Sequence, residues 1–416
     1  MRLNKITNYL LYAAIAVLLF GSGYKYAEWD IKQNARELYT HTVFNANAPA
    51  IKNDDGKNID FSLFWETWEK VEQKYIDDTK LDPQKMFYGS IKGMVAALGD
   101  PYTFFMTPEE NKQSKDELGG KFEGIGAQLG LKNNQVVVIA PLKNSPAETA
   151  GLRTGDIITQ VDGESTKDWT LVQTVSKIRG EKGTKVTLTI NRSGAEKTIA
   201  ITRNEINVPS IELTFESNNG KSVAYLKLNQ FGDNTNEEWD KAINDIANRW
   251  KNSQIAGMIL DVRSNPGGYL EGAVYIGSEF LDKGKVIVTQ EMTDTDNMVY
   301  TVKRNGKLLD IPLVVLIDQG SASASEILSG ALRDYGRAKL VGMKSFGKGS
   351  VQEAVDLSAG AGLHVTIAKW ILPNGDWING TGIKPDIEIE NTIEDGNTIT
   401  SDNDKQLKTA IQELTK

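Results

Sequence analysis

Between residues 206 and 392 the chain alternates short aliphatic runs with amphipathic stretches. The strongest amphipathic stretch is EEWDKAINDIANRW, residues 237–250, whose apolar residues recur at the spacing of one helix face. Aliphatic runs of strand length lie at residues 221–228, 256–263, 285–290, 312–318 and 364–372. Such alternation is typical of an α/β domain in which helices pack on a sheet. We therefore expect an α/β core over residues 206–392.

The chain ahead of this core changes character twice. Residues 118–205 contain short β-runs separated by glycine turns, with a helix candidate at 168–178. Their strand candidates are residues 135–140, 156–163 and 185–192. Residues 60–117 carry aromatic and aliphatic residues at helical spacing instead. Two polar segments remain, a linker at 28–59 and a C-terminal tail at 393–416 that ends in a surface helix.

The amino terminus has a basic start followed by an apolar run. Arg2 and Lys5 precede about 15 apolar or small residues, slightly fewer than the roughly 20 that a spanning helix needs. No clean small-residue cleavage site follows the run, so we favour an uncleaved signal anchor over residues 1–27. A cleaved signal peptide and a buried soluble helix are the alternatives. The anchor implies a single crossing of a bacterial cell membrane, with the catalytic part on the extracytoplasmic side.

The composition limits the chemistry available to this chain. It has no cysteine, which excludes disulfides, a thiol nucleophile and Cys-based metal sites. With only two histidines, His41 and His364, a zinc site built on several histidines is not expected. The net charge of −8 argues against nucleic acid as the main partner. The composition therefore argues against a metal site built on cysteine or on several histidines.

A glycine-rich turn opens the β-rich region. FEGIGAQLG, residues 122–130, places Gly124 and Gly126 on either side of Ile125, just before a short strand. Successive backbone N–H groups in such a turn form a nest that holds a carboxylate, and an extended peptide pairs with the strand that follows. An ordinary hairpin entry explains the same glycines, so the turn alone decides nothing.

The stretch NSPAETAGLRTGDIITQVDGEST, residues 144–166, is more specific. It resembles the signature of PDZ domains, and with its flanks the resemblance covers about residues 118–205. PDZ domains bind the free carboxyl ends of polypeptides by adding them as a strand. The resemblance therefore implies a module that recognises protein C-termini, with Gly124, Ile125 and Gly126 as its carboxylate-binding turn.

A serine-rich stretch, GSASASEI at residues 320–327, joins an aliphatic run to a helix-like run. It holds Ser321, Ser323 and Ser325, and a serine hydroxyl needs a neighbouring base to act as a nucleophile. Ser321 and Ser325 point away from Ser323 in an extended turn, or cap the helix that follows. The local chemistry leaves the choice among the three open. Glu326 suits the first helical turn, and we assign it no catalytic role.

The candidate base is a lysine. His41 lies beside the apolar amino-terminal run, and His364 opens a predicted strand, where a lone histidine is more often structural. A lysine acts as a base when burial favours its neutral form, and Ser-Lys pairs are a known variant of the serine triad. GMKSFGKGSVQ, residues 342–352, offers Lys344 and Lys348.

Two features favour Lys348 without deciding the matter. Gly347 and Gly349 flank it and let the backbone approach a substrate closely. Gln352 lies four positions later, and on a strand these two positions share a face, so Gln352 is expected to hydrogen-bond the amine. A solvated glycine turn explains the same pattern.

The motifs GSASASEI, RDYGRAKLVG, KSFGKGSVQ and LPNGDWINGTGIKPDI occur in this order. Together with LDVRSNPGG they resemble the C-terminal processing peptidases, also called tail-specific proteases, over about residues 60–390. The resemblance implies Ser323 as nucleophile, Lys348 as base and Gln352 as the residue that orients the lysine. It also implies a serine endopeptidase that recognises C-terminal tails through its PDZ domain and cleaves them through an acyl-enzyme, without a cofactor.

Further residues follow from the same resemblance. The oxyanion hole needs two backbone N–H donors, and Ala324 supplies one because it follows the nucleophile at the helix start. The NPGG turn supplies the other, from Gly268 rather than Gly267, although without the resemblance this is equally a plain turn. The resemblance also suggests that the PDZ domain gates the site through Arg179, for which a solvated loop arginine is the alternative.

The expected fold is α/β and multidomain, with an N-terminal anchor helix, a small helical segment, a β-rich PDZ domain and a peptidase core of crotonase-like ββα architecture. The expected partners are proteins or peptides with exposed C-termini, and the membrane through the N-terminal helix. A homodimer through the amino-terminal helices and an activating adaptor protein are further interpretations.

Two functions of other classes are weighed against the peptidase. A catalytically silent, membrane-tethered PDZ scaffold would not need to keep Ser323, Lys348 and Gln352 together. An acyl-processing enzyme of the crotonase type would not need a PDZ insert for a small thioester substrate.

Overall fold

The computed structural model describes residues 25, 59–132, 135–142, 144–167, 169, 171–293, 295–391 and 403–416. The predicted anchor at 1–27 and linker at 28–59 lie outside these residues, apart from Lys25 and Ile59. Within the described part of the chain, no helix is both long and apolar enough to cross a membrane. The chain divides into two compact units, Met1–Asp82 and Pro83–Lys416.

The described part of the first unit holds α2 (Ser62–Lys74) and the 3-10 helix η1 (Asp78–Lys80). The predicted aromatic face of α2 forms, but none of its residues is buried. The rest of the expected helical segment belongs to the second unit, as α3 (Pro83–Ala96), β1 (Phe104–Met106) and α4 (Pro108–Leu118). A capping box starts α4: Thr107 Oγ1 accepts from the Glu110 N–H, and the Glu110 carboxylate accepts from the Thr107 N–H.

The core of the second unit is a six-stranded sheet. Its strands, in spatial order, are β10 (Ile211–Asn218), β11 (Lys221–Leu228), β12 (Met258–Asp261), β15 (Leu313–Ile317), β16 (Lys339–Gly342) and β19 (Ile387–Glu388). The first two strands are antiparallel and the others run parallel. Every residue of β12 and β15 is buried, as expected for central parallel strands covered on both faces.

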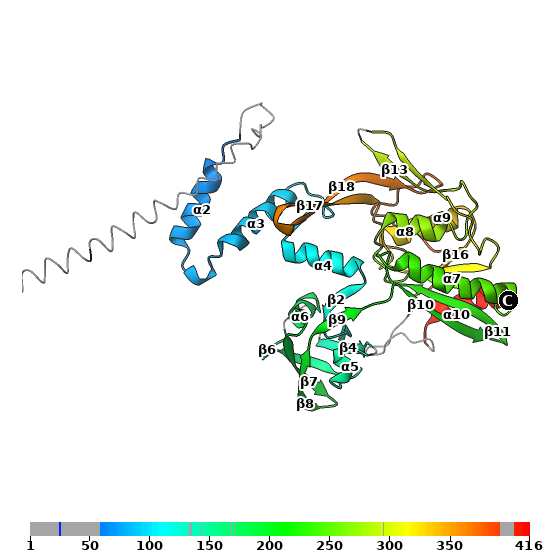
Figure 1. Ribbon diagram of the computed structural model, residues 1–416, viewed down its shortest axis with the longest axis horizontal. Helices are drawn as coiled ribbons and strands as arrows, with labels where there is room; N and C mark the ends of the chain where they lie inside the picture. Colours follow the sequence, from blue (N-terminus) through cyan, green and yellow to red (C-terminus); the bar gives the residue numbers. More distant parts are fainter. Residues whose placement is uncertain are drawn as a thin grey trace, which may run out of the picture. The chain divides into compact units, whose positions relative to one another are not determined.

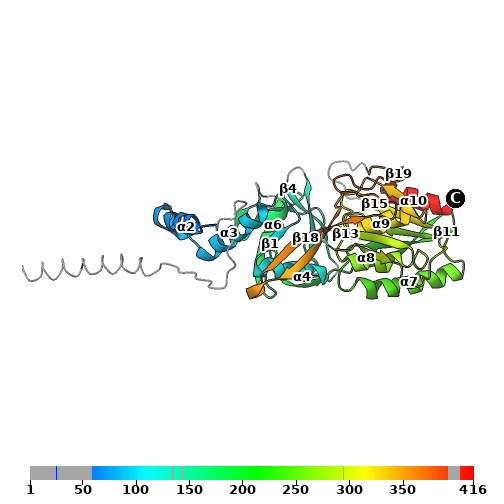
Figure 2. The ribbon, with the colours of Figure 1, turned by 90° about the horizontal axis from the view of Figure 1, so that it is seen from above.

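Helices cover both faces of this sheet (Figures 1 and 2). Along β11, Leu226 and Leu228 share a cluster with α7 (Thr235–Lys251), α8 (Leu270–Gly277) and α9 (Ala324–Asp334). Val223 lies on the opposite face of β11 and packs instead with Leu407 and Ala410 of α10 (Lys405–Thr415). The expected polar tail at 393–416 therefore ends in a helix with one buried face, because that face completes the far side of the sheet.

A second, antiparallel sheet is built around one long strand, β18 (Gly362–Ile371). Its neighbours are β1, β13 (Val286–Met292) and β17 (Ser350–Asp356), and β14 (Met298–Thr301) pairs with β13. The 3-10 helix η2 (Ser358–Gly360) joins β17 to β18. This sheet matters for function because the loop with Lys348 leads directly into β17.

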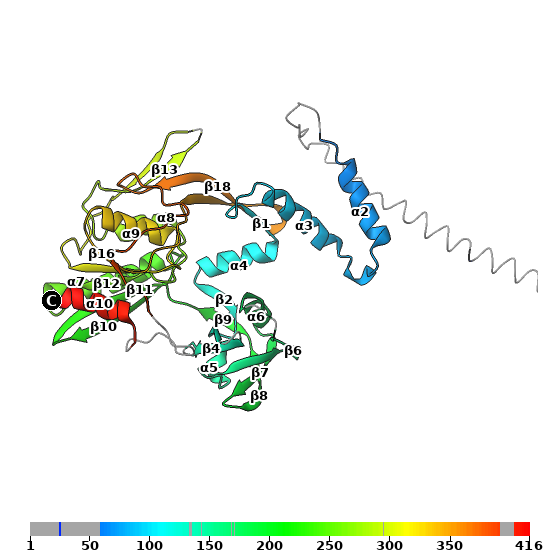
Figure 3. The same ribbon diagram turned by 180° about the vertical axis from the view of Figure 1, so that it is seen from behind.

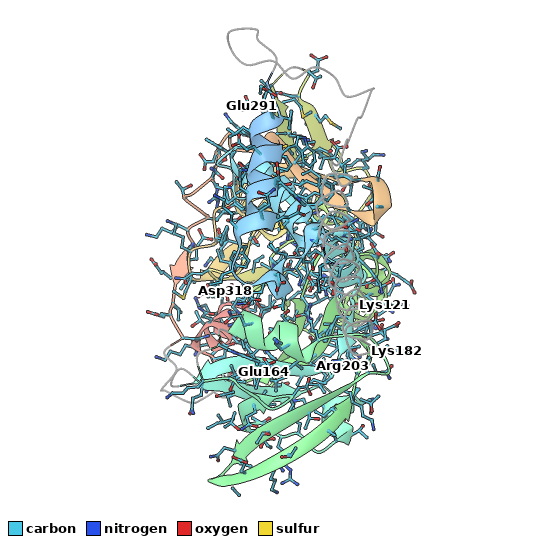
Figure 4. The ribbon with its side chains drawn as sticks, turned by 90° about the vertical axis from the view of Figure 1, so that its left-hand side faces the viewer. Lys121, Glu164, Lys182, Arg203, Glu291 and Asp318 are labelled. Atoms are coloured by element: carbon cyan, nitrogen blue, oxygen red, sulfur yellow. The ribbon has the colours of Figure 1, made fainter. Side chains whose placement is uncertain are left out.

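The β-rich module forms between two paired strands, β2 (Lys121–Gly124) and β9 (Asn204–Asn207) (Figure 3). Its antiparallel sheet contains β3 (Ala127–Lys132), β4 (Gln135–Pro141), β5 (Ile157–Val161), β6 (Glu164–Ser165), β7 (Lys185–Arg192) and β8 (Ala195–Thr202). Helices α5 (Pro146–Thr149) and α6 (Leu171–Ile178) complete it. Arg203, labelled in Figure 4, is buried and donates to the carbonyls of Lys177 and Ile178 at the end of α6.

These modules confirm the predicted fold class, an α/β core with a β-rich insert. The aliphatic runs that predicted β7 and β11 coincide with the strands themselves. The helix expected at 168–178 is α6, which begins a few residues later.

Candidate active site

The serine-rich stretch forms the turn between β15 and α9. Ser323 is the residue before the first helical position, with φ 54° and ψ −116°. A positive φ is uncommon for a residue with a side chain, and such strained positions cluster at active sites. Asp318, labelled in Figure 4, holds the start of the turn, because its carboxylate accepts from the N–H groups of Gly320 and Ser264.

Hydrogen bonding separates the three serines. Ser321 and Ser325 are fully buried, and their hydroxyls donate to the carbonyls of Val262 (2.7 Å) and Asn265 (3.0 Å). Ser323 is partly exposed, and its hydroxyl donates no hydrogen bond to any described residue. The hydroxyls of Ser321 and Ser325 thus fasten the turn to the residues that follow β12, whereas the Ser323 hydroxyl proton is not engaged by any described residue.

The NPGG turn lies directly against Ser323. A side chain at Gly267 would place its Cβ 2.8 Å from the Ser323 Cβ and 3.0 Å from the Ala324 nitrogen. Asn265 is fully buried; its side chain donates to the Leu228 carbonyl and accepts the Gly267 N–H at 2.9 Å. The Gly267 N–H is therefore already occupied.

Gly268 is the better placed donor of this turn. It pairs with Phe231 in an isolated parallel bridge, in which Phe231 bonds to Gly267 and Tyr269. In this pattern the N–H of the bridging residue itself points away from its partner strand. The geometry supports the choice of Gly268 over Gly267, with Ala324 at the first position of α9 as the second donor.

A buried carboxylate joins the two predicted catalytic residues. Glu326 is fully buried, and one of its oxygens accepts the backbone N–H groups of Ser323 (2.9 Å) and Lys348 (3.0 Å). The other oxygen accepts the Gly347 N–H (2.7 Å) and the Ser345 hydroxyl (2.6 Å). Burial raises the pKa of Glu326, and these four hydrogen bonds oppose that rise.

The Lys348 side chain extends from this anchored loop into a partly buried site. Its Nζ lies 5.1 Å from the ring centroid of Tyr102. Burial lowers the pKa of Lys348, whereas the charges of Asp100 and Glu326 act in the opposite direction. Lys344, the alternative base, has an exposed side chain. Burial is the larger effect, so the pKa of Lys348 lies below the ordinary lysine value.

Gln352 does not make the hydrogen bond that the sequence predicts. Its amide donates to Ser350 Oγ (2.8 Å) and Thr366 Oγ1 (3.1 Å), and no described residue bonds to the Lys348 amine. The expectation assumed an unbroken strand from Lys348 to Gln352. In the structure β17 begins only at Ser350, and its register shifts between Val351 and Gln352, which changes the face that Gln352 presents.

A cavity of about 970 Å³ adjoins the lysine loop. Its lining includes Asp100, Tyr102, Met292, Phe346, Thr366 and Trp377. Phe346 is anchored by its backbone N–H to the Ser321 carbonyl, and Trp377 donates from Nε1 to the Gly349 carbonyl. The described residues contain no group of three or more histidine, aspartate or glutamate side chains arranged to hold a metal ion.

The predicted carboxylate-binding turn joins β2 to β3. Gly126 has φ 73°, and a Cβ there would lie 2.5 Å from the Ser145 Cβ, so only glycine fits. The carbonyls of Ile125 and Gly126 accept from Ala147 and Leu142, and the Ile125 side chain is buried. The adjoining strand, β3, has a partner on one side only, because β4 is its sole neighbour in the described sheet.

Arg179 lies just past the end of α6 and makes a close ion pair with Glu117 of α4. Its guanidinium also stands 5.1 Å from the ring centroid of Phe122. Further along α4, Asn111 and Lys115 both bind Asp356 at the end of β17. Arg179 is thus connected through α4 to the strand that follows Lys348.

Sequence reasoning missed Glu326, Asn265 and Glu117 as site residues. In the sequence, Glu326 is explained well enough as an acidic residue in the first turn of a helix, so it did not suggest a role in the site. Its bonds to Gly347 and Lys348 bridge 21 and 22 positions, which no local pattern reveals.

Comparison with known proteins gives consistent matches along the chain. Residues 222–389 match peptidase family S41, residues 137–192 match the PDZ domain, and residues 18–110 match the activating protease CtpB N-terminal domain. The chain is 35% identical over 387 residues to the carboxy-terminal processing protease CtpB of Bacillus subtilis, covering 92% of this chain and 78% of the relative.

Two further similarities extend this result. The chain is 36% identical over 358 residues to a carboxy-terminal-processing protease of Bartonella bacilliformis, covering 86% of this chain and 81% of the relative. The solved structure of a photosystem II D1 C-terminal processing protease is 30% identical with a TM-score of 0.52, covering 79% of this chain and 92% of that chain.

Proposed function

This chain belongs to the carboxy-terminal processing proteases of peptidase family S41, and we propose that Ser323 and Lys348 are the nucleophile and the base of its serine endopeptidase activity. One observation carries the assignment: the Glu326 carboxylate binds the backbone of both residues and so holds them in one cluster. The free hydroxyl proton of Ser323 and the lowered pKa of Lys348 support the two roles.

The reaction follows from these roles. Neutral Lys348 accepts the hydroxyl proton as Ser323 Oγ attacks the carbonyl carbon of the scissile peptide bond. The N–H groups of Ala324 and Gly268 stabilise the oxyanion of the tetrahedral intermediate. The lysine then gives its proton to the leaving amine, and an acyl-enzyme remains. Neutral Lys348 then takes a proton from water, which attacks the ester carbonyl. The lysine gives this proton to Ser323 Oγ as the shortened protein is released.

The PDZ domain would capture the end of the substrate. The turn Gly124–Ile125–Gly126 receives the terminal carboxylate, and the peptide adds to the free edge of β3. α6 packs close to β3 and provides the opposite wall. We propose that binding of a peptide end to the PDZ domain is transmitted to the catalytic loop by Arg179, through Glu117 and α4.

We further propose that residues 1–27 anchor the enzyme in a bacterial cell membrane with its catalytic part outside the cytoplasm. The basic start and apolar run of the sequence support this. The exposed aromatic face of α2 supports pairing of two copies, with an adaptor protein as the alternative occupant. Membrane fractionation with and without residues 1–27, and light scattering of the detergent-solubilised chain, test these assignments.

The catalytic proposal is tested with the full chain and an unfolded protein substrate. Ser323→Ala and Lys348→Met should each abolish cleavage, and both variants should still bind a C-terminal peptide. Cleavage by Ser323→Ala at the wild-type rate would overturn the assignment. Peptide binding without cleavage by the wild-type enzyme would instead favour the silent scaffold.

A further inference from the structure

The turn between α3 and β1 carries two residues that the proposed mechanism does not use. Asp100 precedes Pro101, whose fixed φ suits the second position of a tight turn, and the Thr103 N–H closes the turn onto the Asp100 carbonyl. The Asp100 carboxylate accepts the Tyr102 N–H at 3.0 Å and the Thr103 hydroxyl at 2.7 Å. The turn therefore fixes the carboxylate of Asp100 and the ring of Tyr102 together.

This turn faces the amine of Lys348. The Nζ lies 5.1 Å from the Tyr102 ring centroid, within the range of an attraction between a cation and an aromatic face. Among the described residues, none accepts a hydrogen bond or forms an ion pair with this amine. The ring of Tyr102 is thus the one directed contact that the described chain gives it, and a ring face attracts an ammonium rather than a neutral amine.

Among the described residues, three titratable groups interact electrostatically with Lys348: Glu326, His364 and Asp100. Glu326 lies on α9, and its carboxylate is occupied by four hydrogen bonds. His364 lies on β18, and burial together with the charge of Lys348 lowers its pKa, which keeps it neutral. Asp100 is different: burial opposes ionisation, but hydrogen bonds from Thr366 and Thr103 lower its pKa, so it carries a full negative charge.

We propose that Asp100 and Tyr102 form a seat for the protonated amine of Lys348, and so stabilise the charge that the lysine acquires when it accepts the Ser323 proton. The inference rests on the proposed function. In the acylation step the O–H bond of Ser323 breaks, the proton binds Lys348 Nζ, and the Oγ electron pair forms the new bond to carbon. Asp100 stays ionised throughout, and the proton leaves with the amine product.

The seat also gives Gln352 a role that does not need direct contact with the lysine. Gln352 donates to Thr366 Oγ1 at 3.1 Å, and the Thr366 N–H donates to Thr103 Oγ1 at 3.0 Å. Thr103 in turn donates to Asp100. Gln352 is therefore a positioning residue that supports the Asp100 carboxylate through two threonines.

The experiment measures kcat/KM against pH for the full chain with an internally quenched peptide. Asp100→Asn removes the charge that favours the ammonium and keeps one of the two acceptor oxygens: its amide oxygen can still accept the Tyr102 N–H, while its NH2 group then faces the Thr103 hydroxyl, which can rotate to accept from it. We expect the ascending limb of the profile to move to lower pH, because the neutral amine becomes easier to form. We also expect the kcat/KM plateau at high pH to fall about tenfold, because an amine with a lower pKa is a weaker base and removes the Ser323 proton less effectively. Asp245→Asn, the same charge change on the exposed face of α7, should leave the profile unchanged.

A second pair of variants tests the ring. Tyr102→Phe keeps the aromatic face and should keep the limb in place, whereas Tyr102→Leu should move it in the same direction as Asp100→Asn. A lower plateau with an unmoved limb in both Asp100→Asn and Tyr102→Leu would show a merely structural role and overturn the inference. A limb that persists in Lys348→Met would instead overturn the proposed function, so the two failures are distinguishable.

Discussion

The carboxylate of Glu326 accepts the backbone N–H of Lys348 at 3.0 Å, across 22 positions of sequence. The same oxygen accepts the backbone N–H of Ser323, so a single buried group sets the spacing of the nucleophile turn and the lysine loop. Several consequences of this and the neighbouring contacts are open to measurement.

Glu326→Gln should impair both stability and catalysis. A glutamine keeps one oxygen, but its NH2 group then faces two N–H or O–H donors in a fully buried site. We expect a loss of about 1–3 kcal/mol in the free energy of unfolding for each donor left unsatisfied, measured by denaturant titration, with a lower kcat. Glu237→Gln, which breaks a fully exposed pair with Lys241, should leave the free energy of unfolding almost unchanged. Equal effects of the two substitutions would contradict this account.

Asn265→Ala should destabilise the NPGG turn, residues 265–268, which holds the proposed oxyanion donor Gly268. It leaves the Leu228 carbonyl and the Gly267 N–H without partners, at about 1–3 kcal/mol for each group. Because the Gly268 donor depends on the same turn, kcat should fall while binding of a C-terminal peptide to the PDZ domain is unaffected. Asn248→Ala on the exposed face of α7 is the matched control. A normal kcat in a destabilised Asn265→Ala protein would show that the geometry of this turn does not contribute to catalysis.

Lys348→Met should give an inactive protein that is more stable at neutral pH. The folded state lowers the pKa of Lys348, so below that value the buried ammonium disfavours folding. Wild-type stability should therefore gain from this group as pH rises from the lowered pKa towards the ordinary lysine value, and Lys348→Met should lack that contribution. Activity should fall by about 10³-fold or more. Unfolding titrations at several pH values check the sign; a Met variant less stable at neutral pH would disprove the burial argument.

Arg179→Ala should uncouple peptide capture from turnover. The ion pair with Glu117 is largely exposed, so its loss should change the free energy of unfolding by at most about 1 kcal/mol. The measurement is cleavage of an internal peptide with and without an added C-terminal peptide, in Arg179→Ala, Glu117→Gln and the double variant. Coupling through this pair requires that the double variant lose no more stimulation than either single variant. Unchanged stimulation in all three would exclude the route.

Arg263→Met should destabilise the core far more than surface changes do. Arg263 contacts Asp261 and Asp404, whose side chains are 1% and 5% exposed. Removing it leaves two buried carboxylates uncompensated, with an expected cost of about 3–5 kcal/mol in thermal or denaturant unfolding. Lys241→Met, which breaks an exposed pair with Glu237, serves as the comparison and should have little effect.

Much of the fold followed from local pattern. Long aliphatic runs such as 185–192 and 221–228 predict strands because nearly every second side chain must be buried. The antiparallel edge strand β10 was not predicted, although Asn219 and Gly220, both with positive φ, form the tight turn that marks a hairpin. The signal was present in the sequence and was weaker than that of the buried central strands.

The candidate site was predictable where a motif was local and not where it depended on distant contacts. The serine motif predicts a strand-to-helix turn, but only the structure distinguishes the three serines, because the hydroxyls of Ser321 and Ser325 bind carbonyls just past the end of β12. The predicted bond from Gln352 to Lys348 fails because a register shift in β17 is invisible to a rule of strict alternation. Asp100 and Tyr102 belong to no motif that the sequence reveals, and only the fold brings them to the amine of Lys348.

The free edge of β3 has a further consequence for which proteins can be cut. A strand can be added there only by a segment whose own backbone groups are unpaired over several residues. A C-terminus that is held in a helix or sheet of its own fold offers no such segment, whereas a disordered or unfolded C-terminus does. Under the proposed mode of binding, the β3 edge therefore selects substrates first by whether their C-terminal residues are unfolded. A preference for particular side chains acts only among C-termini that are already unfolded.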